Sequence, residues 1–260
     1  MRCGPTLTPV PATREGAELI IASQTLATKR RGPAAWARPG FRARLGLIVL
    51  LLLGLLPVLP GFYHFIQARP GQRLPDPLAA LLPVGDVSTP TFLLIYGSVA
   101  ATLVFLLPRP YLLLRALWAY YFLQLLRMLT LWLVPLEPPA LLLVLHDPVM
   151  DQLFEATTQP ITRDLFFSGH TATMALVVLM GRGRRWRRIW TPVAVAVAVL
   201  VLVQRAHYSY DVLAAPFFAW GAYWLAGQVA WRSPGSRLAT NIFRRYRPQS
   251  SPPSPSAQRR

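Results

Sequence analysis

The sequence predicts an all-α integral membrane protein in which six transmembrane helices pack into one bundle. Hydrophobic residues make up 53% of the 260-residue chain and charged residues only 14%, which is too apolar for an ordinary soluble domain. The apolar residues gather in long runs that are separated by short segments rich in proline and arginine. The chain is therefore expected to cross a membrane several times rather than to carry one anchor helix.

The first apolar run, residues 45–65, predicts a membrane helix that is kinked by Pro57 and Pro60. A cleaved signal peptide is disfavoured, because the basic region before this run is far longer than usual and no A-x-A-like site follows it. The remaining spans are expected at residues 89–107, 111–134, 165–180, 189–203 and 212–231.

This reading divides the chain into three parts. Residues 1–44 are expected to be a basic, disordered cytoplasmic tail, and residues 45–231 the six-helix membrane domain. Residues 232–260 are expected to be a second cytoplasmic tail that is basic and rich in proline and serine. The single cysteine, Cys3, lies in the first tail, so the sequence predicts neither an internal disulfide nor a cysteine-based metal site.

The charge of the chain indicates which side of the membrane each loop occupies. Lys and Arg number 27 against 10 Asp and Glu, and the basic residues stand in short blocks beside apolar runs. Such blocks are typical of cytoplasmic membrane loops, so we do not expect nucleic-acid binding. With both termini in the cytoplasm, 22 of the 27 basic residues fall on the cytoplasmic side. The exceptions are Arg69, Arg73, Arg127, Arg163 and Arg205.

Two polar stretches at the ends of apolar runs carry the candidate chemistry, and this topology places both on the extracytoplasmic side. In the second stretch, His207 and Asp211 stand four residues apart and share one face of a helical turn. The carboxylate can hold one imidazole nitrogen as a donor, which leaves the other nitrogen unprotonated for nucleophilic or base chemistry. A hydrogen-bonded pair with a purely structural role is the alternative.

The first stretch, Arg163 to Thr171, places His170 beside Ser168 and Gly169, where a helix is expected to begin. Free backbone N–H groups at a helix start bind phosphate. We expect the hydroxyls of Ser168 and Thr171, together with the guanidinium groups of Arg163 and Arg205, to complete an oxyanion cage. Simple helix capping by Ser168 is the alternative.

Arg127 lies well inside the expected third span, and Arg115 lies near its start. An arginine within a membrane is costly, which makes Arg127 a candidate for phosphate binding. Snorkelling of its side chain to the interface is the alternative. Two histidines at one membrane depth, with a carboxylate and nearby cations, fit phosphoryl transfer: one attacks phosphorus and the other protonates the leaving alkoxide.

These residues resemble a known family. Ser168-Gly169-His170-Thr171 and His207-Tyr208-x-x-Asp211 are similar to the two catalytic motifs of the sphingomyelin synthase branch of the type 2 phosphatidic acid phosphatase (PAP2) superfamily. Arg73-Leu74-Pro75-Asp76 resembles a further motif of that branch, and Arg115, Arg127 and Leu136-x-Pro138-Pro139 resemble its third-helix motif. Asp164 stands at the acidic position of the motif around Ser168, although Thr162-Arg163 replaces the usual Cys-Gly before it.

The resemblance implies a PAP2-like fold and a lipid head-group phosphotransferase that needs no cofactor and no metal. It implies that His207 forms a phosphohistidine, that Asp211 orients it, and that His170 protonates the leaving lipid alcohol and then activates the acceptor. The expected partners are a phospholipid donor and a lipid alcohol acceptor, diacylglycerol or ceramide. We also expect Arg73–Asp76 and Leu141–Leu145 to fold over the mouth of the site and to favour an acceptor from the bilayer over water.

Three alternatives stay open at this point. The first is a lipid phosphate phosphatase acting on phosphatidic acid, which the extra guanidinium of Arg163 beside Asp164 would favour. The second is a metal site formed by His170, His207 and Asp211, which nearby arginines disfavour. The third is a non-catalytic lipid-binding scaffold or transporter, although no inverted internal repeat is evident.

Overall fold

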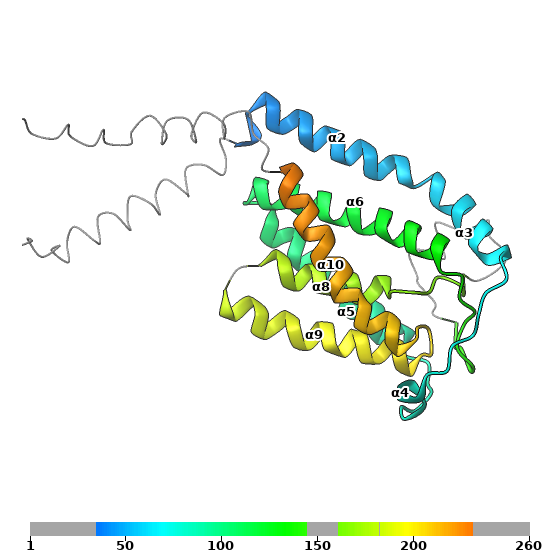
Figure 1. Ribbon diagram of the computed structural model, residues 1–260. Helices are drawn as coiled ribbons and strands as arrows, with labels where there is room; N and C mark the ends of the chain where they lie inside the picture. The colour runs from blue at the N-terminus through cyan, green and yellow to red at the C-terminus, as the bar shows by residue number, and fades with distance from the viewer. Residues whose placement is uncertain (1–34, 145–160, 182, 231–260) are drawn as a thin grey trace, which may run out of the picture.

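A computed structural model describes residues 35–144, 161–181 and 183–230 of the chain (Figure 1). Most of the first expected tail, all of the second and residues 145–160 of the long loop lie outside this described part. Every regular element within it is a helix, and one isolated bridge pairs Gln72 with Leu136. The expected all-α class is thereby confirmed.

The first expected span is a pair of helices, α2 (Pro39–Leu55) and α3 (Val58–Ala68). They meet at a bend of 41°. The break falls at Leu56 and Pro57, as expected from a proline, which lacks the N–H group that would continue the helix. The helix begins at Pro39 rather than at residue 45, so Arg42 and Arg44 stand on its first turns.

Four further helices agree with expected spans to within five residues at each end, and each is long and apolar enough to cross a membrane. They are α5 (Ser88–Leu106), α6 (Pro110–Leu133), α9 (Arg184–Val203) and α10 (Ser209–Ala230). With α2 and α3 counted as one broken span, the described residues contain five candidate membrane crossings. This set of apolar helices is consistent with an integral membrane protein.

The fourth expected span is shorter than the sequence suggested. Helix α8 (Gly169–Met180) has 12 residues and is about 18 Å long, whereas a bilayer core is about 30 Å thick. Residues 165–168 are not helical, because Phe166 has a φ of 114° and Ser168 caps the helix that follows. The count of six full spans is therefore not confirmed.

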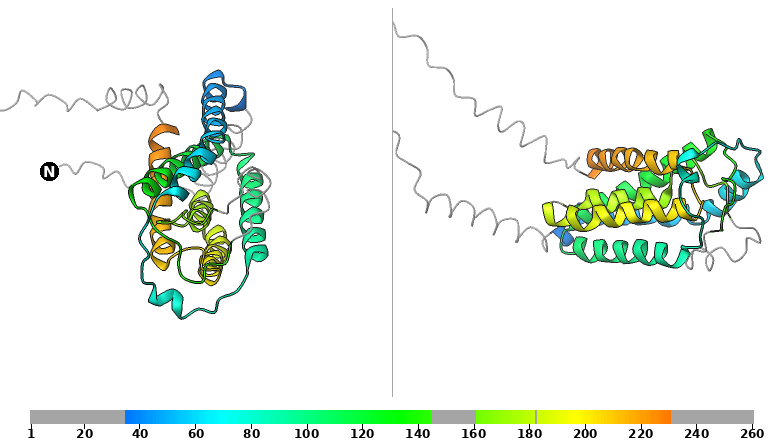
Figure 2. Two further views of the ribbon diagram at one scale, coloured as in Figure 1. Left: turned by 90° about the vertical axis from the view of Figure 1, so that its right-hand side faces the viewer. Right: turned by 90° about the horizontal axis from the view of Figure 1, so that it is seen from below.

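Helix α8 is the centre of the bundle. Helices α5, α6, α9 and α10 all pack against it, and the end-on view in Figure 2 shows them arranged around it. A helix enclosed by protein does not have to span the hydrocarbon layer by itself, since its ends and the chain before it are shielded from lipid. On α10 a stripe of four fully buried alanines lets the neighbouring helices approach closely: Ala215, Ala219, Ala222 and Ala226.

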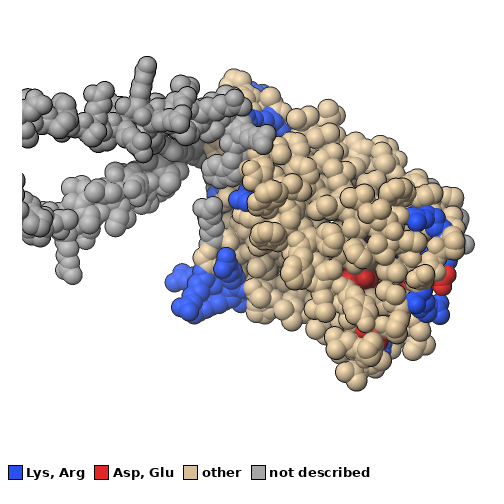
Figure 3. Space-filling view, viewed as in Figure 1, with Lys and Arg blue, Asp and Glu red and all other residues tan. Residues whose placement is uncertain are grey.

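The two ends of the bundle carry different charge (Figure 3). A block of exposed arginines at the start of α9 lies at one end: Arg184, Arg185, Arg187 and Arg188. At the opposite end, where α9 ends and α10 begins, acidic residues lie together with basic ones. Both candidate stretches lie at this mixed end.

Candidate active site

The first stretch forms the start of α8. Ser168 is fully buried, and its hydroxyl oxygen accepts hydrogen bonds from the backbone N–H of Thr171, at 3.3 Å, and from the Thr171 hydroxyl, at 3.1 Å. These bonds are a helix cap, which satisfies one of the free N–H groups at the helix start. The hydroxyls of Ser168 and Thr171 thus bond to each other, and the N–H groups of Gly169 and His170 stand at the helix start beside them.

Arg127 reaches this helix start from α6. Its side chain is 5% exposed, and its guanidinium donates to the carbonyl oxygen of Phe167, at 2.6 Å, and to the carboxylate of Asp164. The guanidinium lies so close to Gly169 that a Cβ atom there would come within 2.7 Å of its Cζ atom. A glycine is therefore needed at position 169 to let the cation approach the helix start. The side chain points inward, so it does not snorkel to the interface.

The second stretch forms the turn into α10. The Nδ1 atom of His207 lies 3.5 Å from the Oδ2 atom of Asp211, and the two side chains are 4% and 2% exposed. The same Oδ2 atom accepts a hydrogen bond of 3.1 Å from the backbone N–H of Tyr208. A distance of 3.5 Å is long for a hydrogen bond, so the two groups face each other without a close bond. The carboxylate faces Nδ1 and leaves Nε2 on the opposite side of the ring.

The two stretches, far apart in sequence, meet in the structure. The backbone N–H of Ser168 donates to the carbonyl oxygen of Asp211 over 3.1 Å, which ties the start of α8 to the start of α10. The ring centres of His170 and His207 are 6.0 Å apart, and Phe92 of α5 packs edge-on against His170. A phosphorus atom can be reached from both imidazoles at such a separation.

Asp76 braces the second stretch from a distant loop. Its carboxylate accepts hydrogen bonds from the backbone N–H of Ser209, at 2.6 Å, and from the Ser209 hydroxyl, at 2.9 Å. It also caps the one-turn helix α4 (Pro77–Ala80) through the N–H of Ala79. Partial burial acts to raise the pKa of Asp76, but these hydrogen bonds outweigh it and hold the pKa below its ordinary value.

Two segments lie over the turn that carries His207. The Tyr208 hydroxyl accepts from the backbone N–H of Leu74 and donates to the carbonyl oxygen of Glu137. Farther along, the N–H of Leu143 donates to the carbonyl oxygen of Gln204, and the Gln204 side chain donates to that of Val144. The segments expected to fold over the site therefore contact the turn 204–208, while Leu145 lies outside the described residues.

The other candidate cations lie around this centre. The Arg163 guanidinium donates to the carbonyl oxygens of Gln67 and Arg69 and pairs with Glu137 at 3.6 Å. Arg205 is 9% exposed, has a φ of 57° and donates to the carbonyl oxygen of Leu82. Arg115 lies over the ring of Tyr223 and ties α6 to α10.

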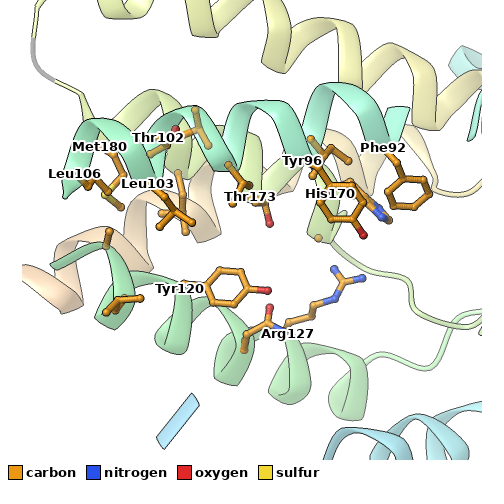
Figure 4. Close-up of a pocket in the computed structure, with 18 of the residues that line it drawn as sticks. Phe92, Tyr96, Thr102, Leu103, Leu106, Tyr120, Arg127, His170, Thr173 and Met180 are labelled. Carbon is orange, nitrogen blue, oxygen red and sulfur yellow. The ribbon is translucent and has the colours of Figure 1, made fainter. Parts of the chain in front are cut away.

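A cavity of about 410 Å³ extends from His170 into the bundle between α5, α6 and α8 (Figure 4). His170, Arg127 and Asp164 line its polar end, whereas Leu106 and Met180 line the opposite end. Most of the remaining lining is apolar, as in pockets for small ligands. No pattern in the sequence marked this cavity, because its walls come from elements that meet only in the fold.

Comparison with known proteins adds one finding. Residues 163–228 match the family model described as PAP2 superfamily C-terminal. No curated protein and no solved structure matches the chain. Within the described part of the chain, no three His, Cys, Asp or Glu side chains are placed to hold a metal ion together. The matched segment contains both histidine stretches, which supports the PAP2 superfamily for this part of the chain, and its members act on phosphorylated lipids as phosphatases or phosphotransferases.

Proposed function

We propose that the protein transfers a phospho-head group between two lipids through a phosphohistidine on His207. The observation that carries this proposal is the meeting of His170, which lines the polar end of a cavity between membrane helices, with the pair of His207 and Asp211 beside it. Histidine pairs of this kind suit phosphoryl transfer, because one imidazole attacks while the other moves the proton.

In the first half of the reaction, Nε2 of His207 attacks the phosphorus of the donor phospholipid. A bond forms between Nε2 and phosphorus, and the bond from phosphorus to the glycerol oxygen breaks. His170, protonated at the start, gives its proton to the departing alkoxide and releases diacylglycerol. Asp211 stabilises the positive charge that develops on the His207 ring.

In the second half, His170 acts as a base. It takes the proton from the hydroxyl of an acceptor lipid, and the acceptor oxygen attacks the phosphorus. The bond from phosphorus to Nε2 breaks, which restores His207 and returns His170 to its protonated form. Both half-reactions balance without an outside oxidant, reductant or metal.

The phosphoryl oxygens need positive partners during both steps. In this proposal the N–H groups of Gly169 and His170 at the start of α8 and the guanidinium of Arg127 supply them. Arg127 is suited to the task, since its charge is already held beside that helix start and needs no reorganisation. Arg205 is buried close to His207 in sequence and is the second candidate, and Arg163, which pairs with Glu137 as Arg127 pairs with Asp164, is the third.

We favour transfer over hydrolysis because of what covers His207. The segments 72–76 and 136–144 bond to the turn 204–208 and leave His207 only 3% exposed. The cavity beside His170 has mostly apolar walls, which favour a lipid alcohol over bulk water as the acceptor. The alternative is a lipid phosphate phosphatase with the same chemistry, and the assay below distinguishes it from a transferase.

The test is an assay of the purified protein in liposomes. Phospholipid labelled in the head group is supplied with diacylglycerol or ceramide, and phosphatidic acid is supplied in a parallel reaction. We expect a new labelled phospholipid whose amount rises with the acceptor. Release of inorganic phosphate from phosphatidic acid without any transfer product would make the protein a phosphatase, and no product of either kind would favour a scaffold or transporter.

We also propose that both termini are cytoplasmic and that the site faces the other side of the membrane. The asymmetric distribution of basic residues supports this orientation. In a Cys3→Ser background, a cysteine at Arg73 near the site or at Arg185 on α9 can be labelled with a reagent that does not cross membranes. Labelling of intact cells at position 73 and not at 185 is expected, and the reverse pattern would overturn the orientation.

A further inference from the structure

We propose that Gln124 and Thr173 form a subsite for the acyl carbonyl group of the lipid that occupies the cavity. Both residues line the cavity, Gln124 from α6 and Thr173 from α8. Figure 4 shows Thr173 directed into the space between the helices. The inference rests on the proposed function in one respect, namely that the cavity holds a lipid.

The hydroxyl of Thr173 is placed in an unusual way for a membrane helix. A threonine in an apolar helix commonly donates to the carbonyl four residues before it, as Thr91 of α5 does to Val87 and as Ser98 does to Leu94. The side chains of Thr173 and Gln124 make no hydrogen bond with any residue in the described part of the chain. Polar groups left unpaired in apolar surroundings are costly, so these two side chains call for a partner inside the cavity.

The depth of the two residues matches the chemistry of an acylated lipid. Thr173 follows His170 by three residues, and Gln124 precedes Arg127 by three residues on a helix that runs the opposite way. At 1.5 Å per residue, Thr173 lies about 4.5 Å farther into the cavity than His170, and Gln124 lies about 4.5 Å farther in than Arg127. In diacylglycerol and in ceramide, the nearest acyl carbonyl is separated from the reacting hydroxyl oxygen by a short chain of single bonds that spans roughly 5 Å.

The hydrogen-bonding capacity of the pair also fits. The Gln124 amide offers N–H donors and the Thr173 hydroxyl offers one O–H donor, while a carbonyl oxygen can only accept. Beyond the pair the lining toward Leu106 and Met180, where the hydrocarbon chain would lie, is mostly apolar, with Thr102 as a polar exception. The subsite would thus select lipids whose chains are joined through an ester or an amide over lipids whose chains are joined through an ether.

The experiment compares diacylglycerol with dialkylglycerol of the same chain length, in which each carbonyl group is replaced by a methylene group. Binding is measured on His207→Ala protein in lipid nanodiscs, so that no turnover disturbs the equilibrium. We expect diacylglycerol to bind about tenfold more tightly. Gln124→Leu and Thr173→Val should each reduce that ratio several-fold, and the double variant should bring it close to one. The comparison of the two lipids on otherwise unchanged protein tests the inference even if a variant fails to fold.

Thr102→Val is the matched control. It makes the same chemical change in the same cavity, but Thr102 lies toward the end formed by Leu106 and Met180, so the ratio should stay near tenfold. A ratio near one with unchanged protein, or an unchanged ratio in the double variant, would overturn the subsite. Turnover is assayed separately: ester selectivity without any transfer would refute the proposed function alone, and transfer without ester selectivity would refute the subsite alone.

Discussion

The starts of α8 and α10 each present a histidine at the same end of the bundle, yet they are held in different ways. The start of α8 is capped by its own residue Ser168, and it also bonds to Arg127 of α6 and to the backbone of Asp211 on α10. The turn into α10 is held by Asp211 within the turn and also by Asp76, 133 residues away from its partner Ser209. Both starts are tied to other helices, but only the second is also held by a carboxylate from a distant loop among the contacts described above.

This difference corresponds to a difference in exposure and task. His170 lines the cavity, where lipid alcohols would enter and leave, whereas His207 is buried beneath two segments. In the proposed reaction His170 exchanges protons with two different lipids, while His207 keeps one covalent partner that must not meet water. A histidine that holds a covalent intermediate away from water benefits more from a rigid and enclosed position than one that only exchanges protons.

The largest expected effect comes from breaking the α10 pair while keeping its fold. Asp211→Asn should lower kcat about 10³- to 10⁴-fold, because the amide no longer holds the His207 ring in the required protonation state. The Asn oxygen can still accept from the backbone N–H of Tyr208, so the melting temperature should change little. Head-group transfer in liposomes measures the first quantity. A variant that kept more than a tenth of the activity would show that Asp211 is not needed for orientation.

The next effect concerns the start of α8. In Gly169→Ala the new methyl group would meet the Arg127 guanidinium, which is bonded to Phe167 and Asp164 and cannot easily withdraw. Displacing that cation should lower activity about 10- to 100-fold. The control is Gly221→Ala on α10, where nothing lies within 4 Å of the added atom and activity should be kept. Equal activity of the two variants would mean that the position of Arg127 does not matter.

A smaller effect is expected when the distant brace is removed. Asp76→Ala should destabilise the protein by about 0.5–2 kcal/mol, as the loss of a helix cap does. Ser209→Ala removes only the bond from the hydroxyl and keeps the bond from the backbone N–H, so its effect should be smaller. Thermal unfolding in detergent gives both values. If Asp76→Ala melted at the same temperature as the unchanged protein, the brace would contribute nothing.

Acid should remove the same brace. Because the pKa of Asp76 is lower in the folded protein than its ordinary value of 3.8, the carboxylate stabilises the fold above about pH 4. That contribution is lost as the pH falls through the lower, folded-state pKa. Asp76→Asn cannot titrate at this position, so its melting temperature should lie below that of the unchanged protein at pH 6. The gap should shrink toward pH 3, and a gap that widened in acid would contradict the assignment.

The same contrast explains which features could be predicted from sequence. Apolar runs and prolines located the long helices and the break at Pro57, since those signals are local. The sequence also predicted that a helix begins beside Ser168, as α8 does, but it counted the non-helical residues 165–168 as part of a full span. The brace from Asp76 and the cavity were beyond sequence reasoning, because they depend on contacts between segments far apart in the chain.

Two adjacent residues in the extended segment before α8 have separate partners. Arg163 and Asp164 are adjacent, and the sequence suggested that they act together. In the structure Arg163 pairs with Glu137, while Asp164 pairs with Arg127 inside the bundle. Side chains alternate in direction along an extended backbone, so adjacent residues there commonly serve different partners.

The central claim is that His207 carries the phosphoryl group and His170 moves the protons, and one measurement tests it directly. A donor whose leaving group is a nitrophenol needs no acid to depart, so His170→Ala protein should still attack it but should fail to activate an acceptor. When the phospho-head group of this donor is labelled, the account predicts one equivalent of acid-labile label on His170→Ala protein and none on His207→Ala protein. Label on the His207→Ala protein, or rapid turnover without either histidine, would contradict it.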